Sequence, residues 1–168
     1  MRTLRGFITI STISLALAIS AFGQTVLTKL DGSRVDVESQ NGKIVVLAIG
    51  ASWLPLSDKQ AEFTNALAKR YAAKNVVFYF VVTDSTDPRS KNFASNEAVA
   101  KFAADRKLTV PVLRDSDGAL TTKNFKIEQV PSFVILNKNG DSTTELFGGI
   151  DPKYDLIGPI SKAIDKLL

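Results

Sequence analysis

Three observations in the sequence predict an α/β fold, in which a mixed central sheet is flanked by helices. Residues 44–49 and 76–82 are continuous apolar runs rich in β-branched residues, which is typical of strands buried on both faces. Residues 57–74 lie between them and carry apolar residues at helical spacing, with basic residues toward the end. Two buried strands joined by an amphipathic helix predict a parallel crossover.

The first residues have the pattern of a secretory signal peptide. Arg2 and Arg5 precede an apolar stretch at residues 7–22, and small residues stand just before residue 24. We therefore expect residues 1–23 to be a cleaved signal peptide and residues 24–168 to form a single domain, located in the periplasm or secreted. The alternative is a retained membrane anchor, for which the apolar stretch is slightly short.

Composition restricts the classes of partner and cofactor. The chain has 21 basic and 17 acidic residues, so loss of two arginines with the leader leaves 19 against 17, a net charge of +2. This balance predicts no nucleic-acid partner. No second apolar stretch approaches membrane length, so we expect no membrane contact after cleavage. The chain contains no cysteine and no histidine, which leaves a transition metal almost no ligands, so we predict no metal and no cofactor.

The other elements are expected from turn signals and further apolar runs. Ser57 followed by Gln60 has the pattern of a capping box that opens the first helix. Asp151-Pro152 is expected to open the last helix, and Gly158-Pro159 to break or kink it. The remaining elements, in order, are an N-terminal β-hairpin at 25–37 with its turn at Asp31-Gly32, a loop at 84–95, a helix at 96–106, a strand at 110–113, a short helix ending near Phe125, a strand at 130–136 and an antiparallel strand at 142–147.

The turn between the first buried strand and the first helix carries the strongest functional signal. It reads Gly-Ala-Ser-Trp-Leu-Pro-Leu-Ser over residues 50–57. Free N–H groups at the start of a helix, placed at the carboxyl end of a buried strand, favour an anion. The sequence therefore places its candidate site at this end of the sheet.

Residues 42–57 resemble the active-site segment of thioredoxin-like redoxins, especially the extracytoplasmic TlpA-like thiol-disulfide oxidoreductases. In that family the tryptophan is followed by Cys-x-x-Cys, whereas Leu54 and Ser57 take the two cysteine positions here. The resemblance implies a thioredoxin-like three-layer sandwich, with Pro131 at the position of the family's cis-proline. Because the thiolate is the nucleophile in dithiol exchange, the family's chemistry cannot proceed with this chain's own residues.

Two functions are therefore considered. The first is a non-catalytic module that binds an extended peptide or an envelope protein, since the family holds substrate backbone against the residue before the cis-proline without needing a thiol. The alternative is a thiol-disulfide oxidoreductase role that depends on a partner's cysteines or a bound thiol, and a purely structural role is a third possibility. The residues expected to form the binding groove are Trp53, Leu54, Pro55, Ser57, Val130 and Pro131.

Several single residues have two interpretations. Trp53 is either part of a recognition surface or packed under the turn. Ser57 is a helix cap or, alternatively, a hydroxyl that holds a ligand anion. Asp115 and Asp117 are interpreted as turn residues because the other ligands of a calcium loop are missing. Asp84 is interpreted as a solvated loop residue.

Overall fold

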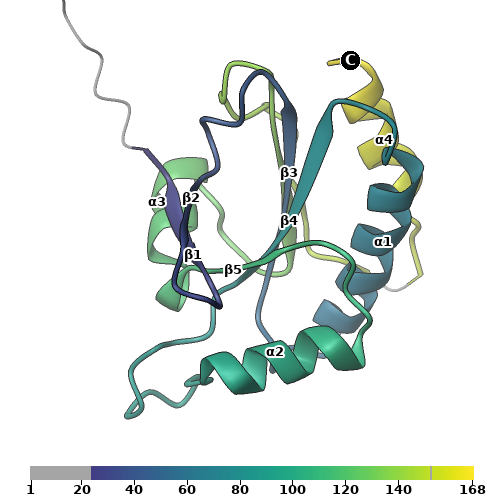
Figure 1. Ribbon diagram of the computed structural model, residues 1–168. Helices are drawn as coiled ribbons and strands as arrows, with labels where there is room; N and C mark the ends of the chain where they lie inside the picture. The colour runs from purple at the N-terminus through teal and green to yellow at the C-terminus, as the bar shows by residue number, and fades with distance from the viewer. Residues whose placement is uncertain (1–23, 152) are drawn as a thin grey trace, which may run out of the picture.

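The computed structural model describes residues 24–151 and 153–168, so the predicted signal peptide at 1–23 lies outside the described residues. Seven strands form one mixed sheet in the order β2-β1-β5-β4-β3-β6-β7 (Figure 1). The strands are β1 (Val26–Lys29), β2 (Arg34–Asp36), β3 (Ile44–Gly50), β4 (Val76–Val82), β5 (Val112–Arg114), β6 (Ser132–Leu136) and β7 (Phe147–Gly148). The helices are α1 (Leu56–Arg70), α2 (Asn96–Asp105), the 3₁₀ turn η1 (Ser116–Gly118), α3 (Ala119–Phe125) and α4 (Ile157–Asp165).

The strand β3 lies between a parallel and an antiparallel neighbour. It pairs in parallel with β4, from Ile44 opposite Val76 to Gly50 opposite Val82. On its other side it runs antiparallel to β6, with Ile49 opposite Ser132. Every residue of β3 is buried, as the continuous apolar run predicts. The parallel β3-α1-β4 crossover and the β1-β2 hairpin are both confirmed.

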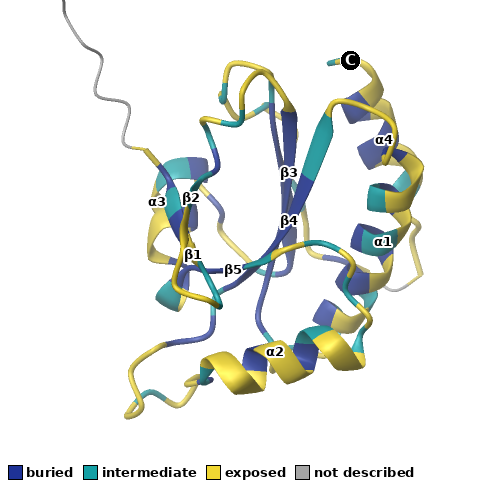
Figure 2. Cartoon of the chain, viewed as in Figure 1, coloured by how far each residue is buried: buried dark blue, intermediate teal, exposed yellow. Residues whose placement is uncertain are grey.

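Helices cover both faces of the sheet, which gives the three layers of a thioredoxin-like sandwich. Side chains of α1, α2 and α4 pack with β3, β4 and β6 in one apolar core. The end of α3 contributes Phe125 to a second core on the other face, together with Leu27, Leu47 and Leu113. Figure 1 shows α1 and α4 on one side of the strands and α3 on the other, and Figure 2 shows the buried central strands.

Of three predictions near the C-terminus, one holds only in part and two are wrong. The return strand comprises only Phe147–Gly148, preceded by an isolated bridge between Ser142 and Leu136. Asp151 does not cap α4, because the helix begins at Ile157 and the Asp151 carboxylate instead accepts from the Lys153 N–H at 2.9 Å. Gly158 and Pro159 lie in the first turn of α4, where proline is tolerated because its missing N–H has no helical partner. They therefore begin the helix and do not break it.

The described helices include none that is both long and apolar enough to cross a membrane. Within residues 24–151 and 153–168 there is also no group of three or more carboxylate, histidine or cysteine side chains that could hold a metal ion.

Two buried tyrosines predict a loss of stability in alkaline solution. Burial raises the pKa of Tyr71 above its usual value, and Asp165, which accepts from the tyrosine hydroxyl at 2.7 Å, adds to the shift. Burial likewise raises the pKa of Tyr79. Below pH about 10 the folded and the unfolded chain both keep the protons of the two tyrosine hydroxyls. Above that pH the unfolded chain releases them more readily than the folded chain, so stability falls as pH rises. Urea unfolding at pH 8 to 11 measures this slope.

Replacing Tyr71 by phenylalanine is expected to flatten that alkaline slope. At neutral pH the variant should lose about 1 kcal/mol, because the hydrogen bonds of the hydroxyl to Asp165 and to the Ser161 carbonyl are removed. Tyr154→Phe, which changes an exposed side chain, is the matched control. An unchanged slope in Tyr71→Phe would contradict the claim that the raised pKa of Tyr71 contributes to the alkaline loss of stability.

Candidate functional site

The turn at residues 51–55, named here the Trp53 turn, joins the end of β3 to the start of α1. Its backbone closes through the Leu54 N–H, which donates to the Ala51 carbonyl at 3.1 Å. Trp53 is 55% exposed, so it does not pack under the turn, and its indole is available to a partner. Leu54 is half-buried and Pro55 is exposed. The turn therefore presents an apolar surface at the carboxyl end of β3.

The capping box predicted at Ser57 and Gln60 is wrong. The residue before α1 is Pro55, and no side chain caps the helix. Ser57 is fully buried, and its Oγ accepts from the Ala51 N–H at 3.3 Å, so it fixes the turn from beneath. A fully buried hydroxyl offers a ligand no surface, so the alternative interpretation of Ser57 is not supported either.

Gln60 instead joins α1 to two strands. Its Nε2 donates to the Ile49 carbonyl at 3.2 Å and to the Ser132 carbonyl at 2.9 Å, while its Oε1 is buried without a hydrogen-bond partner among the described residues. This amide fits only because residue 50 is glycine. A Cβ at Gly50 would overlap Gln60 Oε1 and lie 2.9 Å from Ser57 Oγ.

Gly50→Ala is therefore expected to destabilise the protein by about 1–3 kcal/mol, since Gln60 must move away from both carbonyls. Gly158→Ala is the matched control, because a Cβ there meets nothing within 4 Å in the first turn of α4. The control should be neutral or more stable by up to about 1 kcal/mol. Urea unfolding compares the two, and equal stabilities would contradict the close packing of Gln60 on Gly50.

Asp84 is buried, so its interpretation as a solvated loop residue is wrong. It is 1% exposed, and its carboxylate accepts from both the N–H and the hydroxyl of Ser52, with the N–H bond at 2.7 Å. Ser52 directly precedes Trp53, so Asp84 holds the Trp53 turn against the end of β4. The buried carboxylate has lost its contacts with water and has two protein donors instead. It therefore fixes the position of the segment that carries these donors.

Arg114 is the buried cation of the same region. The residue is 6% exposed, and its guanidinium donates from Nη2 to the carbonyls of Asp84 at 3.2 Å and Ala94 at 2.9 Å. Nη1 donates to Asn96 Oδ1 at 3.0 Å. Burial lowers the pKa of Arg114 from its usual value, and the Asp84 charge opposes this shift. The side chain ties both ends of the loop between β4 and α2 to the sheet.

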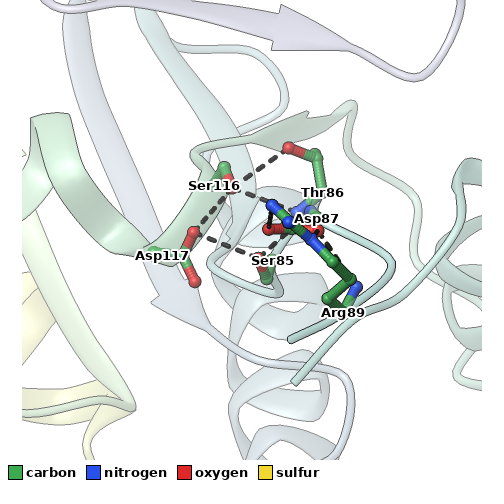
Figure 3. Close-up of polar contacts among 6 residues, drawn as sticks. All are labelled: Ser85, Thr86, Asp87, Arg89, Ser116 and Asp117. Atoms are coloured by element: carbon green, nitrogen blue, oxygen red, sulfur yellow. Dashed lines mark hydrogen bonds and ion pairs between the residues drawn. The ribbon is translucent and has the colours of Figure 1, made fainter. Parts of the chain in front are cut away.

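A second polar network connects the start of this loop to η1 (Figure 3). The Ser85 and Ser116 hydroxyls donate to Asp117 Oδ2 at 3.1 and 2.9 Å, and the Thr86 N–H donates to Ser116 Oγ at 3.0 Å. Asp117 has a φ of 59°, a left-handed conformation that aspartate tolerates better than most residues. Asp117 is thus a turn residue, as predicted.

Asp115 opens the turn, as predicted, because its carbonyl accepts from the Gly118 N–H at 2.9 Å, but it is buried, with only 4% exposed. Its carboxylate accepts from the Leu120 N–H at 3.1 Å and the Thr121 N–H at 2.8 Å. It therefore satisfies free donors in the first turn of α3.

Val130 and Pro131 precede β6 at the same end of the sheet. The Val130-Pro131 peptide bond is cis, which agrees with the position expected for Pro131. Because Ile49 pairs with Ser132, the register places Pro131 beside Gly50, where the Trp53 turn begins. Pro131 is buried and Val130 is half-buried. No hydrogen bond within residues 24–151 and 153–168 uses the backbone N–H or C=O of Val130.

The structure thus separates the six predicted groove residues by accessibility. Trp53, Leu54, Pro55 and Val130 reach the surface, while Ser57 and Pro131 lie beneath it. Sequence reasoning missed Gln60 as a strand contact, and Asp84 and Arg114 as positioning residues. A usable signal for the last two was present, because each is a charged residue close to the end of an apolar strand run. Asp84 stands two residues after β4, and Arg114 is the last residue of β5.

Comparisons with known proteins agree with this arrangement. The model of the Redoxin family matches residues 15–153. The thiol-disulfide oxidoreductase ResA of Bacillus anthracis is 26% identical over 123 residues, a match that covers 73% of this chain and 65% of that protein. The chain therefore matches less than two thirds of the length of this relative.

Solved structures show the same fold. A secreted disulfide oxidoreductase of Mycobacterium tuberculosis is 22% identical and superimposes with a TM-score of 0.67, covering 88% of this chain and 99% of that one. An exposed lipoprotein thioredoxin of Streptococcus pneumoniae is 19% identical, with a TM-score of 0.64 and coverage of 86% and 99%. With a family match over most of its length, a thioredoxin-like sandwich and a cis-proline beside the Trp53 turn, the chain belongs to the Redoxin family, although it contains no cysteine.

Proposed function

We propose that the chain is an exported, non-catalytic thioredoxin-fold protein that binds an extended segment of a peptide or envelope protein. One observation carries the proposal: the backbone N–H and C=O of Val130 have no partner among the described residues, and they lie at the end of the sheet where Trp53 is exposed. An extended peptide can pair with such a backbone by strand-like hydrogen bonds.

The absence of thiols supports a binding role over catalysis. Leu54 and Ser57 occupy the positions at which the family carries its cysteines, and no cysteine exists elsewhere in the chain. An oxidoreductase role would have to draw every thiol from another molecule. The features that remain, an exposed indole and a free backbone edge, are those that recognise a chain without reacting with it.

Export is supported by the leader pattern in the sequence and by relatives of known location. Arg2 and Arg5 precede an apolar stretch that ends just before residue 24. The matched structures include a protein described as secreted and one described as an exposed lipoprotein. The envelope is therefore where we place the partner.

The test is capture from an envelope extract by the purified protein, with identification of the bound partner. Trp53→Ala should reduce capture, since it removes the largest exposed apolar side chain of the Trp53 turn. Leu168→Ala is the control, because it removes another exposed apolar side chain at the C-terminus, away from the Trp53 turn. Capture that is equal in all three proteins would overturn the proposal.

A further inference from the structure

A small cavity lies beside Val130 at the same end of the sheet. It has a volume of about 190 Å³ and is lined by residues that include Thr83, Asp117, Glu128 and Val130. Thr83 donates to the Gly50 carbonyl at 2.8 Å from its N–H and at 3.0 Å from its hydroxyl, which places the cavity next to the end of β3. Sites for small molecules are usually about 300–1,000 Å³. The size therefore fits one side chain of a larger ligand.

The charge of the cavity is negative. Its lining includes the carboxylates of Asp117 and Glu128 and no lysine or arginine. Within the part of the chain that the structure describes, neither carboxylate takes part in an ion pair. Both hydrogen bonds to Asp117 end on Oδ2, which holds the carboxylate in place and leaves Oδ1 for a ligand (Figure 3).

We propose that this cavity, named here the Asp117 pocket, binds the lysine or arginine side chain of an extended peptide whose backbone pairs with Val130. The inference rests on the proposed function and adds a preference to it. Successive side chains of an extended peptide point to opposite faces, so backbone pairing at Val130 directs a neighbouring side chain sideways into the pocket. A long apolar stem that ends in a cation matches a cavity lined by Ile127 and two carboxylates.

The test uses N-acetylated, C-amidated nonapeptides of serine, threonine and valine whose central residue is lysine, norleucine or glutamate. Lysine and norleucine differ only in the ammonium group, so their affinity ratio isolates the charge. The chain has a single tryptophan, so the emission of Trp53 follows binding without a label. We expect the lysine peptide to bind about three- to fivefold more tightly for each carboxylate it contacts, with the glutamate peptide weakest. High salt should reduce the preference.

Two charge-neutral variants locate the effect. Glu128→Gln and Asp117→Asn should each lower the lysine-to-norleucine ratio by about threefold. Asparagine also accepts the left-handed backbone at position 117. Glu62→Gln is the control, because Glu62 is an exposed carboxylate on α1 that pairs with Lys59.

The outcomes separate the inference from the proposed function. If the lysine and norleucine peptides bind equally tightly and both change the emission of Trp53, the proposed peptide groove stands and the charge preference is overturned. A preference that survives in both carboxylate variants would also overturn it. No binding of any peptide would overturn the proposed function, and the inference with it.

Discussion

Replacing Leu54 and Ser57 together by cysteine is expected to convert the chain into a disulfide reductase. The two positions have Cys-x-x-Cys spacing and stand at the start of α1, where the helix stabilises a thiolate. Leu54 is half-buried and Ser57 is fully buried, so one thiol would be accessible and the other protected. A thiol pKa of about 7 would give about 15-fold more thiolate at pH 7 than a free cysteine of pKa about 8.5.

Insulin reduction with dithiothreitol as reductant measures this gain. The unmodified protein and the two single variants, Leu54→Cys and Ser57→Cys, are the controls, and none of them should exceed the background rate. Turnover by the unmodified protein would contradict the non-catalytic proposal directly. A folded but inactive double variant would mean that the site has lost more than its thiols.

Removing the carboxylate of Asp84 is expected to produce the largest loss of stability among the polar residues discussed. In Asp84→Ala the Ser52 N–H and hydroxyl lose their acceptor, and buried Arg114 loses the negative charge that stabilises its charged form. Breaking a buried charge arrangement of this kind costs about 3 kcal/mol or more. Urea unfolding measures the loss. The Trp53 turn should also loosen. Because Trp53 is the single tryptophan of the chain, its fluorescence emission reports this change.

The control for this prediction lies three residues away. Asp87 is exposed and pairs with Arg89 on the surface, so Asp87→Ala should change stability by less than about 0.5 kcal/mol. Asp84→Asn should fall between the two, because an amide keeps one acceptor for Ser52. A stability for Asp84→Ala within the range of the Asp87 control would refute the role given to Asp84.

The sequence predicted the elements whose signals are local. The strands β3 and β4 are continuous apolar runs, and their boundaries agree closely with the prediction because burial on both faces requires apolar residues throughout. The hairpin turn at Asp31-Gly32 is likewise local, with Gly32 at a φ of 86° between the paired strands β1 and β2. The family resemblance then supplied the position of the cis-proline.

The errors concern residues whose partners are distant in the chain. Gln60 bonds the Ser132 carbonyl, 72 residues away, so its place in an apparent capping box was misleading. The contact between Asp84 and Ser52 spans 32 residues, and no periodicity in the sequence encodes it. Tertiary contacts of this kind override local propensity. They also decide which of the six expected groove residues reach the surface, and they bury Ser57 and Pro131.

The most direct test of the central claim is an NMR titration of the ¹⁵N-labelled protein with the tightest-binding nonapeptide of the panel. The account predicts that the amide signals of Trp53, Leu54 and Val130 shift together and that the emission of Trp53 moves to shorter wavelength. In Trp53→Ala, which has no tryptophan emission to follow, the shifts of Leu54 and Val130 should weaken. Shifts confined to another surface, or no shifts with any peptide, would contradict the claim that this end of the sheet is a binding site.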